Sequence, residues 1–141
     1  MSAVSIDFRA VPHGGASPVG EPHESLSALS AMRLGASLYV PATRPDLMAI
    51  ANGHKLAELR SVIFCTEDAV HEQDLDQALA HLAALLPELE PGRMLRFIRP
   101  RGPAVLRRLL RLDGIERIQG FVLPKFGPHT LGDWLRVWDD S

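Results

Sequence analysis

The stretch SVIFCTEDAV, residues 61–70, decides the fold of this chain. Its first part, 61–66, is a short apolar run rich in β-branched and aromatic residues, which predicts a β-strand. The acidic pair Glu67 and Asp68 follows at the carboxyl end of that run. In proteins built from βα units, polar residues at the carboxyl ends of strands are the ones that reach a site. We therefore expect a strand here that carries two acids to a functional edge.

The same pattern recurs on both sides of this stretch. Further apolar runs lie at 37–42, 94–99 and 120–125, with starts about 24, 33 and 26 residues apart, and each is followed by a segment with helical periodicity. Strands that alternate with helices at this spacing predict a parallel sheet with right-handed crossovers. The expected fold class is α/β with about four parallel βα units. Two forms fit: an open four-stranded sheet, or half of an eight-stranded (β/α)8 barrel.

Local signals mark the expected helices. Pro45 suits the first turn of the first helix, because its missing N–H falls where no intrahelical partner exists. Asp74 and Gln77 have the spacing of a capping box before the second helix. The apolar face of that helix is expected to comprise Leu75, Ala78, Leu79, Leu82 and Leu86.

The third and fourth helices are marked in the same way. Gly102 and Pro103 are expected to open the third helix and Gly114 to end it. Thr130 can cap the last helix. That last helix carries Trp134, Leu135 and Trp138.

Composition divides the chain into two parts. Residues 1–33, which include PHGGASPVGEPHESLS, are rich in Gly, Pro and Ser and are expected to form a flexible leader. A short helix between Ser25 and Gly35 would form the end of this leader. Residues 34–141 then form one βα domain, since a chain of 141 residues can bury roughly 68% of its unfolded surface without disulfides. The single cysteine, Cys65, excludes a disulfide framework and, mid-strand, predicts a buried inert thiol.

No apolar run approaches the roughly 20 residues of a membrane span, and no signal peptide is recognisable. We expect a cytoplasmic protein with no membrane association. Net charge is −2 but unevenly spread, because residues 58–90 carry −7 and residues 93–117 carry +6. This pattern offers a nucleic-acid surface as one interpretation. The favoured interpretation is that neighbouring βα units of opposite charge pair with each other.

Five polar residues at the expected strand ends are the candidate site: Arg44, Glu67, Asp68, Arg99 and Lys125. Glu67 could bind a metal or water or transfer a proton, or could form an ion pair with Arg99. Asp68 could instead cap a turn, and Lys125 could be exposed or structural. Arg99 could hold a carboxylate through two parallel hydrogen bonds, which its planar guanidinium suits, or could form a structural pair. The six histidines show no metal-ligand spacing, and no P-loop or GxGxxG is present.

Four segments in order also resemble a known family: LYVPATRPDL, SVIFCTEDAV, RFIRPRG and GFVLPKF. They are similar, over about residues 34–135, to the N-terminal half of the HpcH/HpaI aldolase or citrate lyase beta-subunit-like family, and above all to its carbon–carbon bond lyase branch. The resemblance implies a TIM barrel that cleaves or forms carbon–carbon bonds next to a carbonyl, usually with Mg²⁺. Its substrates are keto or hydroxy acids, often as coenzyme A thioesters.

The resemblance also implies residue roles. Arg44 and Arg99 would bind the substrate carboxylate, while Glu67, Asp68 and Lys125 would be catalytic. Glu67 would support Mg²⁺ indirectly, through its water shell, because the family's principal metal carboxylates come from later strands that this sequence does not contain.

Departures from the family pattern give further expectations. Cys65 stands where the family commonly has Asp, Ala42 replaces a Gly, and the Asn usual after the third-strand Arg is absent. With four βα units, we expect a lyase that is incomplete or partner-dependent. The alternative is a non-catalytic half-barrel interaction subunit, and in both cases we expect a homo-oligomer or a complementing half-barrel.

Overall fold

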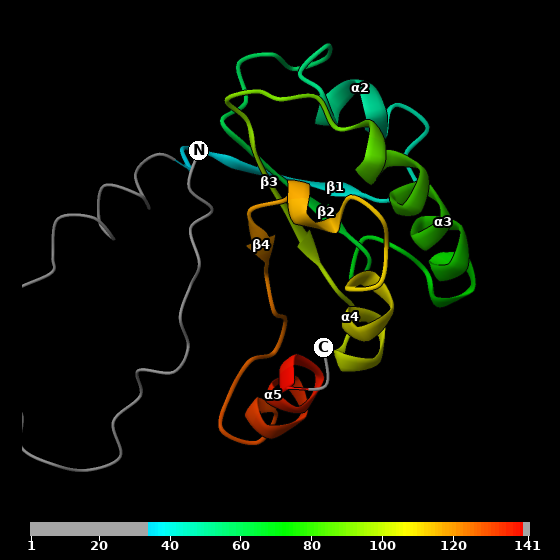
Figure 1. Ribbon diagram of the computed structural model, residues 1–141, viewed down its shortest axis with the longest axis vertical. Helices are drawn as coiled ribbons and strands as arrows, with labels where there is room; N and C mark the ends of the chain where they lie inside the picture. Colours follow the sequence, from blue (N-terminus) through cyan, green and yellow to red (C-terminus); the bar gives the residue numbers. More distant parts are fainter. Residues whose placement is uncertain (1–33, 140–141) are drawn as a thin grey trace, which may run out of the picture.

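The computed structural model describes residues 34–139, and it shows a parallel four-stranded sheet (Figure 1). The strand order is β1-β2-β3-β4, and each neighbouring pair is parallel. The strands are β1 (Ser37–Pro41), β2 (Ser61–Cys65), β3 (Leu95–Arg99) and β4 (Gly120–Phe121). The predicted α/β class and parallel βα repeat are therefore confirmed. The proposed leader and the short helix that begins at Ser25 lie outside the described residues.

Helices connect the strands as the repeat predicts. They are α2 (Leu47–Ala51), α3 (Leu75–Leu85), α4 (Pro103–Leu109) and α5 (Leu131–Asp139), with 3-10 helices η1 (Glu72–Asp74), η2 (Leu86–Glu88) and η3 (Ile115–Arg117). In Figure 1, α2, α3 and α4 lie on the same side of the sheet, and α5 lies beyond α4. No helix among residues 34–139 has the length and apolar character needed to cross a membrane.

The fourth strand is shorter than predicted. Backbone bonds continue its pairing to Val122, whose N–H donates to Ile98 O at 2.9 Å, but the expected run to Lys125 does not form. Two features end it. Pro124 has no N–H to donate to a ladder, and Lys125 has a φ of 51°, which is the left-handed region.

The helix starts follow the sequence signals with two corrections. Gly102 is the N-cap of α4 and Pro103 its first residue, as predicted. Asp74 is the N-cap of α3, but its side chain makes no capping bond, so the predicted capping box is wrong. The preceding turn η1 already provides an acceptor for the Leu75 N–H. Pro45 lies just before α2, whose N-cap is Asp46.

The main core lies between the sheet and the helices on its covered face. It contains Val40, Val62, Phe64 and Ile98 from the strands. From α3 and η2 it contains Ala78, Leu79, Leu82, Leu85 and Leu86. The predicted apolar face of α3 is thus buried, apart from a partly buried Leu75. A full face of leucines against β-branched and aromatic strand residues supplies the main stabilisation of the fold.

Side chains of opposite parity point to the other face of the sheet. Ile63 and Cys65 are buried there, Phe97 is half-buried, and Tyr39 is 46% exposed. None of these four belongs to the main core. This uncovered face is the one that leads towards Glu67 and Arg99, because side chains alternate along each strand.

A second, smaller core attaches the last helix. Trp134 and Val137 of α5 pack with Leu106 of α4. Leu135 of the same helix is 44% exposed. The side chain of Trp138 lies outside the described part.

Gly114 starts η3 rather than ending α4, and it gives a test of the fold. Its φ is 79°, and a Cβ there would lie 2.7 Å from the backbone carbon of Leu86. We expect Gly114→Ala to lower the free energy of unfolding by about 1–3 kcal/mol, because the strain and the backbone contact act together. Urea denaturation measures it.

Gly132→Ala is the matched control, since nothing lies within 4 Å of a Cβ at this position in α5. The control should be neutral or stabilising by up to about 1 kcal/mol. Equal stabilities of the two variants would contradict the packing of η3 against η2.

Candidate active site

The carboxyl ends of β2 and β3 bring an acid and a cation together. In the sheet register Cys65 lies opposite Arg99, and Glu67 follows two residues later. Arg99 Nη2 is 2.5 Å from Glu67 Oε2. The Glu67 side chain is only 6% exposed and that of Arg99 22% exposed. A carboxylate this buried is stable when it is paired with a positive charge.

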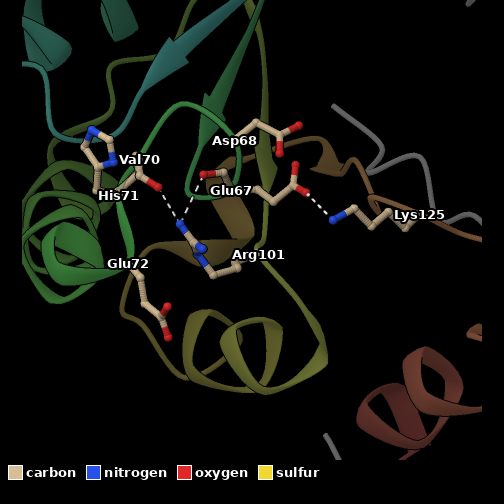
Figure 2. A pocket seen from close by; sticks show the side chains of 7 residues that line it. All are labelled: Glu67, Asp68, Val70, His71, Glu72, Arg101 and Lys125. Atoms are coloured by element: carbon tan, nitrogen blue, oxygen red, sulfur yellow. Dashed lines mark hydrogen bonds and ion pairs between the residues drawn. The ribbon is translucent and has the colours of Figure 1, made fainter.

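Two exposed groups complete this cluster of Glu67, Asp68, Arg99 and Lys125. Lys125 Nζ lies 3.5 Å from Glu67 Oε1, and Arg99 Nη2 donates a hydrogen bond to Asp68 Oδ2 at 3.2 Å. Figure 2 shows the ammonium of Lys125 extended towards the Glu67 carboxylate. Four of the five candidate residues therefore meet at one edge of the sheet.

Arg44 is bound elsewhere. Its guanidinium forms two parallel hydrogen bonds with Asp46, Nε to Oδ1 at 2.7 Å and Nη2 to Oδ2 at 2.8 Å. Lys55 forms an ion pair with the same carboxylate. These two cations hold the pKa of Asp46 well below its usual range. Arg44 therefore makes no direct contact with Glu67, Asp68, Arg99 or Lys125, because the carboxylate of Asp46 binds its planar guanidinium, and its role in substrate binding stays a prediction.

Two buried atoms in the cluster lack hydrogen-bond partners. Glu67 Oε2 is close to Arg99 but receives no aligned hydrogen bond, and Arg99 Nε has no acceptor. Buried polar atoms are usually satisfied, so each exception needs an explanation. Since Glu67 Oε2 is already ion-paired with Arg99, the group that still needs a partner is Arg99 Nε, and an acceptor on a bound group would supply one.

A pocket of about 340 Å³ opens beside these residues (Figure 2). Its lining consists of Glu67, Asp68, Val70, His71, Glu72, Arg101 and Lys125. The volume is at the lower end of the range for small-molecule sites. His71, in the loop after β2, received no role in the sequence interpretation. A histidine at a strand's carboxyl end was the only available signal.

Tyr39 was also missed. Its ring centroid lies 5.6 Å from Arg99 Cζ, a distance at which a guanidinium is attracted to an aromatic face. The position of Tyr39 in β1 could have indicated this, because side chains alternate along a strand and Tyr39 pairs with Ile63 on the uncovered face.

The described residues do not by themselves form a Mg²⁺ site. Within residues 34–139 no group of three or more His, Cys, Asp or Glu side chains could hold a metal ion. Both acids of the cluster are already paired with Arg99. Residues 34–139 therefore offer no complete set of side-chain ligands for Mg²⁺, and the indirect role of Glu67 stays a prediction.

The arginine-rich segment 93–117 is largely occupied by contacts within the chain. Arg96 is buried and donates to Ala51 O and Glu90 O, and burial lowers the pKa of its guanidinium. Arg108 pairs with Asp76. The expected pairing between neighbouring units of opposite charge is thus observed, and the nucleic-acid interpretation loses its main support.

Parallel βα units with helices on one side of the sheet and polar groups at the carboxyl edge define the barrel-type class of α/β proteins. Comparison with family models identifies the particular group: the model for C-C bond lyases of the TIM-barrel fold matches residues 28–141. The chain belongs to this family. A comparison with curated proteins finds no significant match.

The backbone of Lys125 provides a test of the site geometry. Thr130, at the N-cap position of α5, does not direct its hydroxyl to a helix amide. The hydroxyl donates to Lys125 O at 2.8 Å and accepts from Gly127 N at 3.0 Å, which holds the loop.

We expect Lys125→Val to lower the free energy of unfolding by about 1–2 kcal/mol, because β-branched residues avoid positive φ.

Lys125→Asn is the matched control, since Asn tolerates this conformation and also removes the charge. Its stability should stay close to that of the wild type in urea denaturation. If both variants lost the same free energy of unfolding, the loss would come from removing the ammonium group and not from the backbone conformation at residue 125.

Proposed function

We propose that this chain takes part in cleaving or forming a carbon–carbon bond next to the carbonyl of a keto or hydroxy acid, free or as a coenzyme A thioester. The lyase family to which it belongs supports the reaction type. The resemblance to the HpcH/HpaI and citrate lyase beta-subunit-like group supports the substrate class and the use of Mg²⁺.

The observation that carries the proposal is the buried pair of Glu67 and Arg99, in which Glu67 lines the pocket and Arg99 keeps one N–H without an acceptor. Arg99 Nε is a donor without an acceptor, while Glu67 Oε2 is paired with Arg99 Nη2 at 2.5 Å. A substrate carboxylate accepts hydrogen bonds, and a guanidinium binds it well because its N–H groups are planar. A hydroxyl on the neighbouring carbon donates one. A small hydroxy acid offers both groups within a pocket of this size.

Each residue of the cluster then has a proposed task. Arg99 binds the carboxylate, and Tyr39 supports the Arg99 guanidinium from its ring face. Bond cleavage leaves an electron pair on the carbonyl fragment as an enolate, whose negative charge needs a nearby positive group. Lys125 supplies such a charge at the pocket wall. Glu67 can accept a hydroxyl proton and return it to the enolate carbon, so that protons balance.

Mg²⁺, when bound, would polarise the substrate carbonyl. The tasks above are assigned to side chains of the chain itself.

Arg99→Ala tests the substrate role. We expect full-length wild-type protein with Mg²⁺ to release pyruvate or acetyl-CoA from four- to six-carbon keto or hydroxy acids or their thioesters. We expect the variant to lose about 10- to 150-fold in kcat/KM, since a charge-assisted pair is worth about 1.5–3 kcal/mol. Coupled spectrophotometric assay measures it.

Arg108→Ala is the matched control, because its guanidinium pairs with Asp76 on the helical surface. It should keep wild-type turnover. Turnover that survives Arg99→Ala would remove Arg99 from substrate binding, and no turnover of any substrate by wild type would remove the proposed activity.

A second candidate function is that of an interaction subunit. Among the described residues, β1 and β4 are the edges of the sheet, and Leu38 and Tyr39 on β1 are 36% and 46% exposed. Exposed edge strands with apolar side chains favour pairing with another chain. A second copy is the proposed partner.

Sedimentation velocity tests this role. We expect the mass to rise above 15.5 kDa with concentration, and a variant with Leu38→Lys and Tyr39→Lys to stay at the single-chain mass. A wild-type mass of one chain at all concentrations would exclude self-association.

A further inference from the structure

Arg101 binds the loop that carries Glu67. Its Nε donates to Thr66 O at 3.3 Å, and its Nη2 donates to Glu67 O at 3.2 Å and to Val70 O. Three carbonyl groups within residues 66–70 thus converge on one guanidinium, and Figure 2 shows the bonds to Glu67 and Val70. Arg101 lies two residues after the end of β3 and is not one of the five candidate residues.

The same loop is tied to β3 on its other side. Thr66 donates both its N–H and its hydroxyl to Arg99 O, each at 3.0 Å. A turn closes the loop, with Val70 N–H donating to Glu67 O at 3.1 Å. The backbone around Glu67 is therefore held by residues 99 and 101 together, while its side chain remains directed at Arg99 and Lys125.

Only an arginine can make these contacts from one side chain. Its N–H groups are fixed in a planar fork, whereas a lysine ammonium is a single point that cannot reach three separated carbonyl groups equally. The guanidinium lies in the pocket wall, and its hydrogen bonds to the loop are directed away from the carboxylate of Glu67 (Figure 2).

We infer that Arg101 is a positioning residue, whose guanidinium fixes the 66–70 backbone so that the Glu67 carboxylate is held in place for reaction. Only the effect of Arg101 on catalysis rests on the proposed function, and its role in holding the loop does not. A displacement of about 1 Å at a reacting group can cost about 100-fold in rate. Loss of Arg101 should therefore lower kcat more than it raises KM.

Arg101→Met tests the inference in the full chain, with hydrogen exchange of backbone amides as the first measurement. We expect the amides of Glu67 and Val70 to exchange about tenfold faster or more, because a hydrogen bond to a charged group is worth about 1.5–3 kcal/mol. Amides of β2 should keep their protection. Methylguanidinium at millimolar concentration should restore protection in Arg101→Ala. If Arg101→Met does not fold, Arg101→Lys gives the same comparison.

Arg117→Met is the matched control. Arg117 also donates to two carbonyl groups, Pro87 O and Leu89 O, but in η2 and the segment after it. This variant should leave the 66–70 amides and the ratio of kcat to KM unchanged. Where wild type turns over substrate, Arg101→Met should lower kcat about 10- to 100-fold with KM within about threefold.

The outcomes separate the two proposals. Unchanged exchange at Glu67 and Val70 in a folded Arg101 variant would overturn the positioning role whatever the activity. So would equal effects of the Arg101 and Arg117 variants on that loop or on kcat. Faster exchange with methylguanidinium rescue, in a protein without lyase turnover, would sustain the positioning role and reject the proposed function.

Discussion

The parallel pairing of β2 with β3 is the constraint on which the site depends. Parallel strands end at the same edge of the sheet, so the register that sets Cys65 opposite Arg99 also brings Glu67 to the Arg99 guanidinium. A slip of one residue in that register would turn one of these side chains to the helix-covered face. Backbone hydrogen bonds and the buried core, rather than attraction between the charges, therefore determine that the ion pair forms.

The two oppositely charged halves of the chain fit together through hydrogen bonds to carbonyl groups as much as through ion pairs. The arginines of segment 93–117 that donate to carbonyl oxygens are Arg96, Arg101 and Arg117, and their acceptors are Ala51, Thr66, Glu67, Val70, Pro87, Leu89 and Glu90. All these acceptors lie between residues 51 and 90. Connecting segments leave carbonyl groups without ladder partners, and a guanidinium satisfies several of them at once. The arginines of the basic segment therefore serve to satisfy carbonyl groups of the preceding part of the chain.

Arg44 and Arg99 illustrate how differently similar residues are used. Both follow or end an apolar run and both are arginines, so sequence position assigns them the same task. Asp46 binds both nitrogens of the Arg44 fork from two residues away. Arg99 contacts two acids from the neighbouring loop yet keeps a buried Nε without an acceptor. Only the second arrangement leaves a guanidinium N–H without an acceptor.

The sequence by itself determined the order and direction of the strands and the Gly102–Pro103 start of α4, because apolar periodicity and proline chemistry act within a few residues. It also determined that Glu67, Asp68, Arg99 and Lys125 share one edge. Tertiary structure decided the early end of β4, the unused capping box at Asp74 and the exposure of Leu135. It alone decided that Arg101 binds the 66–70 loop, since a guanidinium chooses among acceptors that come within reach only after the sheet has formed.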